Sequence, residues 1–394
     1  MKSILIFSLA YYPSHISGAE VAIKEITDRI APSDIQFYMV THRFARTAPR
    51  VERIGNVEVH RVGFGPAYVS KILFVPLAAL KASQLNCQKK FDALWAMMTY
   101  MLLPLVLAKV LGIRGPYALT LQDGDPYDKV FGRWFILPVV PLLNWGFRNA
   151  TRVSAISNYL ATWPKRRGYQ YQVVMIPNGA STESAQIYPQ VELDALSTKL
   201  GKQKGETLLL SIGRLVHQKS IDMVIRALAL LPEHIRLVVV GDGPDRNELI
   251  MLAEKLNVSK RIAFVGQVNR EETAKYRAVC DIFVLPSRSE GQGISFLSSM
   301  LAGLPVVATQ VGGIADFLFD AKRNPEVEPT GWAVDADSPE QIAEAVKEIL
   351  ANPEQTKKVI ETAKKMVEVK YNWEHIAKAM REKVFGPIIA ELAK

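Results

Sequence analysis

The sequence predicts an α/β protein made of two doubly wound parallel-sheet domains in tandem. Short apolar runs, bounded by glycine or polar residues, alternate with stretches of helical periodicity along the whole chain of 394 residues. This alternation is typical of parallel sheets that helices cover on both faces. A chain that is 49% apolar and 22% charged is also globular and long enough for two cores. Ligands of such sheets bind beyond the carboxyl ends of the strands, so we expect the chemistry in a central cleft that both domains face.

Seven strands are expected in the first half of the chain. They cover residues 4–9, 37–41, 57–62, 93–97, 117–121, 153–156 and 173–176. Helical stretches separate most of them. Residues 19–30 are one such stretch, because Ile23, Ile26 and Ile30 are spaced to share one face of a helix.

The alternation is lost over residues 180–205, which are polar and are interpreted as a connector. We therefore expect an N-terminal domain over residues 1–185 and a C-terminal domain over residues 186–371. The strands expected in the second domain cover residues 208–212, 235–240, 262–265, 282–285 and 306–308. Residues 372–394 are expected to form a final helix, whose apolar anchors are Trp373, Ile376, Met380 and Phe385.

The basic charge of the chain lies in its first half. Residues 1–190 hold 21 Lys and Arg against 11 Asp and Glu, a net charge of +10, and the remainder holds 27 against 28. This excess fits either a solvated surface or an anionic partner, such as a membrane, a lipid phosphate or an acidic glycan. Nucleic acid is not expected as a partner, because no basic–aromatic module or helix-turn-helix pattern accompanies the charge.

Two further features favour a cytoplasmic location. The N-terminal apolar run has only Lys2 before it and no small-residue cleavage site after it, so it is interpreted as a strand and not as a secretion signal. Cys87 and Cys280 lie in unrelated segments, which argues against a disulfide framework or a zinc site.

Two cationic residues follow the first strand that is expected in the second domain. The strand ends at Gly213, and Arg214 and Lys219 follow in a turn that opens a helix. Amide dipoles at a helix N-terminus and fixed positive charges together suit a diphosphate. The later segment Gly241-Asp242-Gly243 resembles a dinucleotide-binding turn, but Arg246 stands where the third glycine belongs. We interpret it as a turn that closes a strand–helix unit.

A glycine-rich loop follows the strand at residues 282–285. Its residues read Pro286-Ser287-Arg288-Ser289-Glu290-Gly291-Gln292-Gly293-Ile294. Gly291 and Gly293 allow backbone N–H groups to approach a ligand closely. Glu290 is unfavourable beside a phosphate but suits sugar hydroxyls, which donate hydrogen bonds to a carboxylate. A second glycine pair, Gly312-Gly313, follows the next strand.

Taken in order, these residues resemble the family-four retaining glycosyltransferases (glycosyl transferases group 1), which have the GT-B fold of two Rossmann-like domains. The stretches 174–179 and 373–377 match as well. The resemblance implies a hexosyltransferase that uses a UDP- or GDP-sugar, no other cofactor and no metal, through an internal-return mechanism. It also implies that the C-terminal helix crosses back to the N-terminal domain.

The resemblance assigns roles to individual positions. Arg214 and Lys219 would hold the donor diphosphate, and Glu290 would contact the transferred sugar. The implied donor-binding residues are Gly18, Gly213, Gly266, Val268, Gly291, Gln292, Gly293, Ile294 and Ser298. Gly18 belongs to the stretch 13–20, which matches a glycine loop that meets the diphosphate from the N-terminal domain.

The chain departs from the family pattern at three places. Ser298 stands where a second glutamate grips the ribose, and Gly18-Ala19 replaces a glycine pair. Gln122 replaces a histidine on the acceptor side, so acid–base help would have to come from Asp123 or Asp125. The alternative for both aspartates is a turn before Pro126.

The acceptor is expected to be a glycan, a lipid-linked compound or a small molecule. Residues 130–147 join Trp134, Phe135 and other aromatics with flanking arginines, a pattern that suits contact with an anionic membrane at its inner face. Burial of these rings in the core is the alternative. Two other functions stay open: a nucleotide-sugar epimerase, and a catalytically silent partner that binds a glycan.

Overall fold

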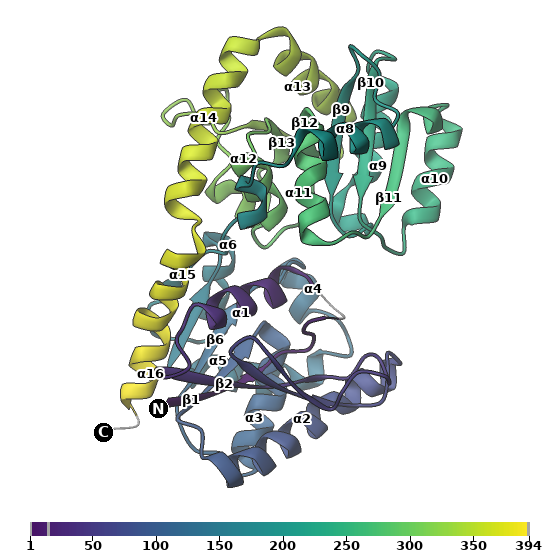
Figure 1. The fold of residues 1–394 in the computed structure, drawn as a ribbon. Helices are drawn as coiled ribbons and strands as arrows, with labels where there is room; N and C mark the ends of the chain where they lie inside the picture. Colours follow the sequence, from purple (N-terminus) through teal and green to yellow (C-terminus); the bar gives the residue numbers. More distant parts are fainter. Residues whose placement is uncertain (1, 14–15, 392–394) are drawn as a thin grey trace. The chain divides into compact units, whose positions relative to one another are not determined.

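The computed structural model describes residues 2–13 and 16–391, and it divides into two compact units (Figure 1). Unit 1 comprises Met1–Asn178 and Trp373–Lys394, and unit 2 comprises Gly179–Asn372. The C-terminal segment therefore packs with the N-terminal domain. The units change at residues 178/179 and 372/373, against the positions 185/186 and 371/372 expected from the sequence.

Unit 1 is built on a sheet of eight strands. In spatial order these are β3 (Val51–Ile54), β4 (Val57–Val62), β2 (Ile35–His42), β1 (Lys2–Phe7), β5 (Ala93–Met97), β6 (Tyr117–Leu121), β7 (Arg152–Ala155) and β8 (Val174–Met175). All neighbours pair in parallel except β3 and β4, which pair as antiparallel strands. The strand β3 was not predicted, because it is a short edge strand with half-exposed side chains.

Helices cover both faces of this sheet, because alternate side chains of each strand point to opposite faces. One layer consists of α2 (Tyr68–Lys89), α3 (Leu102–Val110) and α5 (Val140–Arg148), whose buried side chains pack with Leu5 and Phe7. On the other face the Phe385 ring packs against Trp95 and Phe37. That layer consists of α1 (Gly18–Asp28), α15 (Trp373–Met380), the π-helix η7 (Arg381–Phe385) and α16 (Gly386–Glu391).

Unit 2 contains a six-stranded sheet with parallel neighbours throughout. Its spatial order is β11 (Ile262–Gly266), β10 (Ile235–Val240), β9 (Thr207–Ile212), β12 (Ile282–Leu285), β13 (Val306–Thr309) and β14 (Trp332–Val334). Its helices are α8 (Gln190–Lys199), α9 (Ile221–Ala229), α10 (Arg246–Lys255), α11 (Arg270–Val279), α12 (Ile294–Leu301), α13 (Pro339–Ala351) and α14 (Pro353–Lys370).

The predicted fold class, two doubly wound parallel sheets, is confirmed. The prediction that residues 180–205 are only a connector is wrong, because α8 lies within them. No residue of α8 is fully buried, so its sequence lacks the apolar periodicity that marks the other helices. In the part of the chain that the structure describes, no helix is long and apolar enough to cross a membrane.

We expect the packing of the C-terminal segment to contribute measurably to the stability of unit 1. The Phe385 side chain is fully buried, with ring centroids 5.0 Å from Trp95 and 5.7 Å from Phe37. Phe385→Ala is therefore expected to lower the free energy of unfolding by about 3–5 kcal/mol in urea denaturation. Ile187→Ala, at a side chain that is 99% exposed, is the control and should change it by less than about 0.5 kcal/mol. A Phe385→Ala effect as small as that of the control would contradict this packing.

Candidate functional site

The strand order of unit 2 indicates where its ligand site lies. The chain leaves β9 toward β10 and β11 on one side and returns to β12, β13 and β14 on the other. The order therefore reverses between β9 and β12, and in such sheets a crevice opens there at the carboxyl ends. The loops that leave β9 and β12 carry the cations and the carboxylate that were predicted to act on the donor.

Lys219 and Glu290 form an ion pair across this switch point. Lys219 ends the 3-10 turn η4 (His217–Lys219) after β9, and Glu290 lies in the loop after β12. Their side chains are 21% and 11% exposed, so the pair is mostly shielded from water. The Lys219 chain passes over Gly213, where an added Cβ would lie 3.8 Å from its Cδ.

Arg214 is the exposed cation of the site. It follows Gly213 directly, and within the described residues its guanidinium makes no hydrogen bond or ion pair. An arginine presents a planar set of five N–H donors that can bind a phosphate in two places. The loop after β9 therefore offers one cation that is already positioned by a carboxylate and one that remains available to an anion.

Arg288 connects the two loops, a role that the sequence analysis missed. Its guanidinium forms a double hydrogen bond with Asp222 of α9, at 3.0 and 2.8 Å, and an ion pair with Asp337 at 2.6 Å. It also donates to the carbonyl of His217 at 2.6 Å, while its backbone N–H donates to the Gln218 carbonyl at 2.8 Å. The loop that carries Glu290 is thus fastened to the turn that carries Lys219.

Glycines outside the predicted set allow these loops to pack closely. A Cβ on Gly241 would lie 2.0 Å from the Gly213 carbonyl oxygen, and one on Gly312 would lie 2.0 Å from the Glu290 carbonyl oxygen. Both have positive φ, +133° and +57°. Gly241 therefore supports the site in addition to closing a turn. The Gly241-x-Gly243 and Gly312-Gly313 patterns were the sequence signals for these positions.

The start of α12 lies directly after Glu290. Gly293 adopts a left-handed conformation with φ +94° at the N-cap, and Ile294 begins the helix. Gly291 is buried and Gln292 is 1% exposed, so the loop is packed tightly. The backbone conformation at Gly293 would strain any other residue. The predicted approach of its N–H group to a ligand stays a prediction.

Gly266 and Val268 lie at the end of β11. The Gly266 carbonyl accepts a hydrogen bond of 2.8 Å from the Gly241 N–H. This bond links the end of β11 to the turn after β10, which packs against Gly213. A Cβ on Gly266 would meet no atom within 4 Å, so open space lies beside it. Val268 is half-buried against the core of unit 2.

Ser298 lies in a different environment from the one expected of a ribose-binding residue. It is fully buried in α12, and its Oγ accepts a hydrogen bond of 2.9 Å from Ser181 N–H. Nearby, the buried Arg277 guanidinium donates to Ser184 and Ser299 at 3.1 and 3.2 Å. The residue that replaces the family glutamate thus fastens the segment after Gly179 to α12.

The acceptor-side candidates belong to unit 1 and are held by neighbours. Gln122 and Asn178 exchange two amide hydrogen bonds of 3.0 Å. The Asp123 carboxylate accepts from the backbone and the hydroxyl of Thr99, and its burial raises the pKa to about 6 against the opposing effect of these bonds. Asp125 forms ion pairs with Lys129 and Arg133.

The remaining predicted residue of unit 1 is Gly18, the first residue of α1. The Ser17 N–H before it donates to the Glu20 carboxylate at 2.8 Å, which fixes the start of the helix. Residues 14 and 15 of the predicted glycine loop lie outside the described residues. Among the residues that are described, no cluster of three His, Cys, Asp or Glu is arranged to hold a metal ion.

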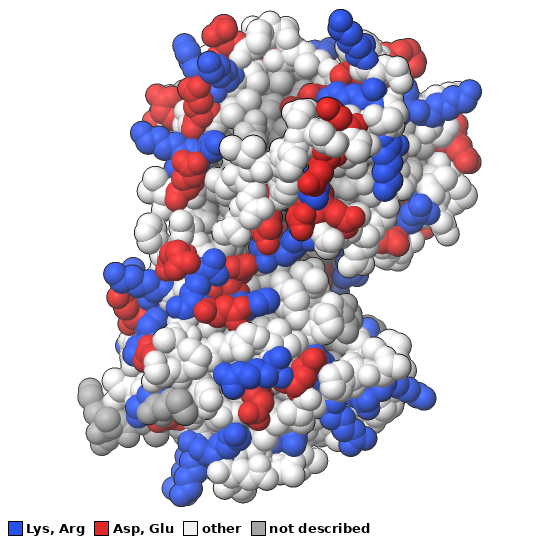
Figure 2. Space-filling view, viewed as in Figure 1, with Lys and Arg blue, Asp and Glu red and all other residues white. Residues whose placement is uncertain are grey.

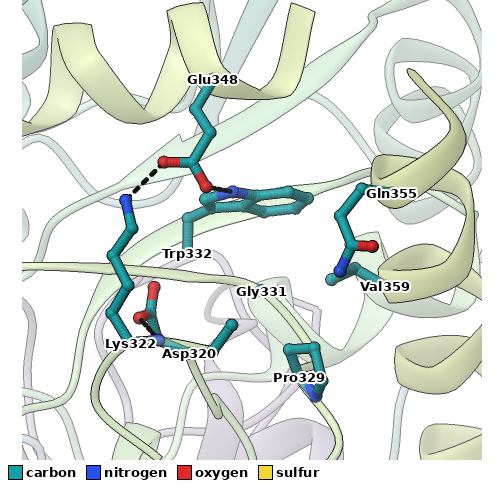
Figure 3. A pocket seen from close by; sticks show the side chains of 9 residues that line it. Asp320, Lys322, Pro329, Gly331, Trp332, Glu348, Gln355 and Val359 are labelled. Carbon is teal, nitrogen blue, oxygen red and sulfur yellow. Dashed lines mark hydrogen bonds and ion pairs between the residues drawn. The ribbon is translucent and has the colours of Figure 1, made fainter. Parts of the chain in front are cut away.

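A small pocket elsewhere in unit 2 is not a candidate site. It is lined by Asp320, Lys322, Trp332, Glu348 and neighbours, and its volume of about 30 Å³ is enough for a water molecule. Figure 3 shows Glu348 reaching from α13 to both Lys322 and Trp332, with bonds of 2.6 and 3.2 Å. Its charged groups already have partners, and none of the predicted site residues lines it.

Comparisons with known proteins identify the family of the chain. The model of the family described as Glycosyltransferase Family 4 matches residues 16–184, and that of Glycosyl transferases group 1 matches residues 194–366. The chain is 40% identical to the alpha-monoglucosyldiacylglycerol synthase of Streptococcus pneumoniae over 34% of this chain and 32% of that protein. It is 33% identical to a GDP-mannose-dependent alpha-(1-6)-phosphatidylinositol monomannoside mannosyltransferase of Mycolicibacterium smegmatis, over 37% and 39%. These alignments span less than half of each relative.

The solved structure of sucrose-phosphate synthase from Thermosynechococcus elongatus is similar over 99% of this chain and 100% of its own, with a TM-score of 0.85 and 20% identity. At that identity the likeness concerns the fold. The two family models together cover both halves of the sequence, including every loop of the site in unit 2. The chain therefore belongs to the GT-B glycosyltransferases of family four, the glycosyl transferases group 1.

Proposed function

We propose that this chain is a retaining hexosyltransferase that takes its sugar from a UDP- or GDP-sugar. The observation that carries the proposal is the Lys219–Glu290 ion pair at the switch point of unit 2, with the exposed Arg214 in the same loop as Lys219. Two cations and one carboxylate match the chemistry of a nucleotide sugar. Its diphosphate is an anion, and its hydroxyls donate hydrogen bonds.

The proposed step needs charge stabilisation more than a protein base. The bond between the anomeric carbon and the diphosphate oxygen breaks, and the acceptor oxygen bonds to the same face of that carbon. The acceptor proton passes to the departing phosphate oxygen, and the nucleoside diphosphate leaves. Arg214 and Lys219 stabilise the negative charge that builds up on the leaving oxygens. Lys219 has three N–H donors, so it can keep Glu290 and bind a phosphate oxygen as well.

The acceptor is proposed to be a glycan, a small molecule or a lipid-linked compound. The names of the two relatives, a glucosyldiacylglycerol synthase and a phosphatidylinositol mannoside mannosyltransferase, support the lipid-linked option. The proposed location is cytoplasmic, at the inner face of a membrane that residues 130–147 contact. Trp134 is 81% and Phe135 is 42% exposed, whereas Phe131 and Phe147 are buried. The alternative, burial of the aromatic rings in the core, is therefore correct for Phe131 and Phe147 and wrong for Trp134 and Phe135.

Transfer is tested by incubating the chain with UDP- and GDP-sugars and candidate acceptors, lipid-linked ones included. We expect release of a nucleoside diphosphate together with a product whose anomeric configuration, read by NMR, matches that of the donor. Inversion of that centre would contradict the retaining mechanism. Interconversion of sugars without nucleotide release would identify an epimerase instead, and donor binding with neither change would identify a silent binding partner.

Arg288 is expected to act as a positioning residue. Its side chain bonds to Asp222, Asp337 and the His217 carbonyl, and in this way it joins the loops that bear Lys219 and Glu290. Arg288→Ala should lower kcat by about 100-fold, because a displacement of about 1 Å has such an effect. Arg288→Lys should keep part of kcat, because a lysine can form one ion pair with Asp222. In both variants the dissociation constant of the donor should change by a smaller factor than kcat. Arg323→Ala, which removes an exposed ion pair with Asp335, is the control. A purely structural role would lower the melting temperature and leave kcat of the folded fraction unchanged.

A further inference from the structure

The two helix layers of unit 1 have different outer surfaces. The layer of α2, α3 and α5 leaves large apolar side chains in contact with water, between 37% and 74% exposed. They are Tyr68, Val69, Ile72, Leu73 and Leu80 of α2, Val110 and Leu111 at the end of α3, and Leu142 and Trp145 of α5. Among the described residues of α1, α15, η7 and α16, no large apolar side chain is exposed to this degree.

The charges of the two layers differ as well. The helices α2, α3 and α5 contain no Asp or Glu. Their charged residues are Lys71, Lys81, Lys89, Lys109 and Arg148. The opposite layer carries acidic residues as well, in pairs such as Lys24 with Asp28 and Arg29 with Glu374. In Figure 2 the lower part of the molecule, where α2 and α3 lie in Figure 1, is mostly white and blue.

A groove adds depth to this surface. It is lined by Val106, Lys109, Val110, Ile113, Leu142 and Trp145, is open to solvent and has a volume of about 550 Å³. Its walls come from α3, the turn after it and α5, which pack against each other. The groove lies where α3 ends and before β6 begins, away from the carboxyl ends of the strands where chemistry is expected.

We propose that the α2–α3–α5 layer binds the surface of an anionic phospholipid bilayer. The apolar side chains would enter the boundary between headgroups and acyl chains, and the lysines would meet the lipid phosphates. Trp134 and Phe135, in the segment between α4 (Tyr127–Phe131) and α5, are exposed apolar side chains as well. The inference deepens the proposed contact through residues 130–147, on which it rests, by adding α2 and the groove.

The charge pattern favours a bilayer over a second copy of the chain. In a symmetric dimer the same patch meets itself, so that the lysines of one copy would face those of the other. No carboxylate of these three helices could compensate that repulsion. A bilayer that contains acidic lipid supplies both the negative charge and the apolar phase that this surface lacks.

The test is co-sedimentation with two kinds of vesicle: equal parts of phosphatidylglycerol and phosphatidylcholine, and phosphatidylcholine alone. The chain should pellet with the acidic vesicles at low salt and be released as salt rises. Ile72→Ser with Leu73→Ser should lower the bound fraction about tenfold, and Lys71→Glu with Lys81→Glu should lower it as well. The matched controls are Met251→Ser, 59% exposed on α10, and Lys378→Glu on α15, and both should bind like the unchanged chain.

A parallel set of variants separates this inference from the proposed function. If Trp134→Ser with Phe135→Ser abolishes binding while the α2 variants bind normally, the contact through 130–147 stands and the wider layer is wrong. Absence of pelleting with acidic vesicles at low salt overturns both. Concentration-dependent dimers that the α2 variants disrupt, without vesicle binding, would show a protein interface instead. Binding of a nucleoside diphosphate, measured on the same samples, reports the folding of unit 2 and does not depend on the membrane result.

Discussion

The ion pair of Lys219 and Glu290 exists because the two strands before these residues are parallel neighbours. Their carboxyl ends meet at one edge of the sheet, so two loops that are 71 residues apart in sequence share one small volume. A buried ion pair contributes little net stability, since removing both charges from water offsets their attraction. We therefore interpret the pair as a functional feature: it holds the side chains of Lys219 and Glu290 where the diphosphate and the sugar of the proposed donor would lie. Arg288 and the glycines at 241 and 312 maintain the loop positions on which the pair depends.

In unit 1 the two helix layers that cover the sheet have different outer surfaces. Its two helix layers bury similar apolar faces, but only one of them carries apolar and basic groups on the outside. Stability of the core does not require exposed side chains such as Ile72 or Trp145, and they would favour association in water. At the carboxyl edge of this sheet Asp123 is buried with a raised pKa, bonded to Thr99, so its first role is to hold the loop after β6.

Much of the fold could be predicted from the sequence because buried parallel strands are mostly apolar runs. The strands β5, β6, β10 and β12 were placed at their observed bounds for this reason, and β4, in which apolar and polar residues are mixed, was placed at its bounds as well. The strands β3 and β14 were missed, because β3 has the charged residues Glu52 and Arg53 at its centre and β14 is only three residues long. In the site, Glu290 and Lys219 could be found because both are charged residues in loops that follow predicted strands. Arg288 could not, because its partners Asp222 and Asp337 are distant in sequence. The position of Ser298 was equally hidden, since one hydrogen bond to Ser181 decides it.

The proposed role of Arg214 and Lys219 is to stabilise the departing diphosphate. It is tested most directly by kcat for sugar transfer at saturating donor in Arg214→Ala and Lys219→Ala, with Lys255→Ala, an exposed lysine of α10, as control. Each of the two variants is expected to fold normally and to lose about 10²–10³-fold in kcat, while the control is unchanged. Near-normal kcat in either variant would contradict the role assigned to that cation.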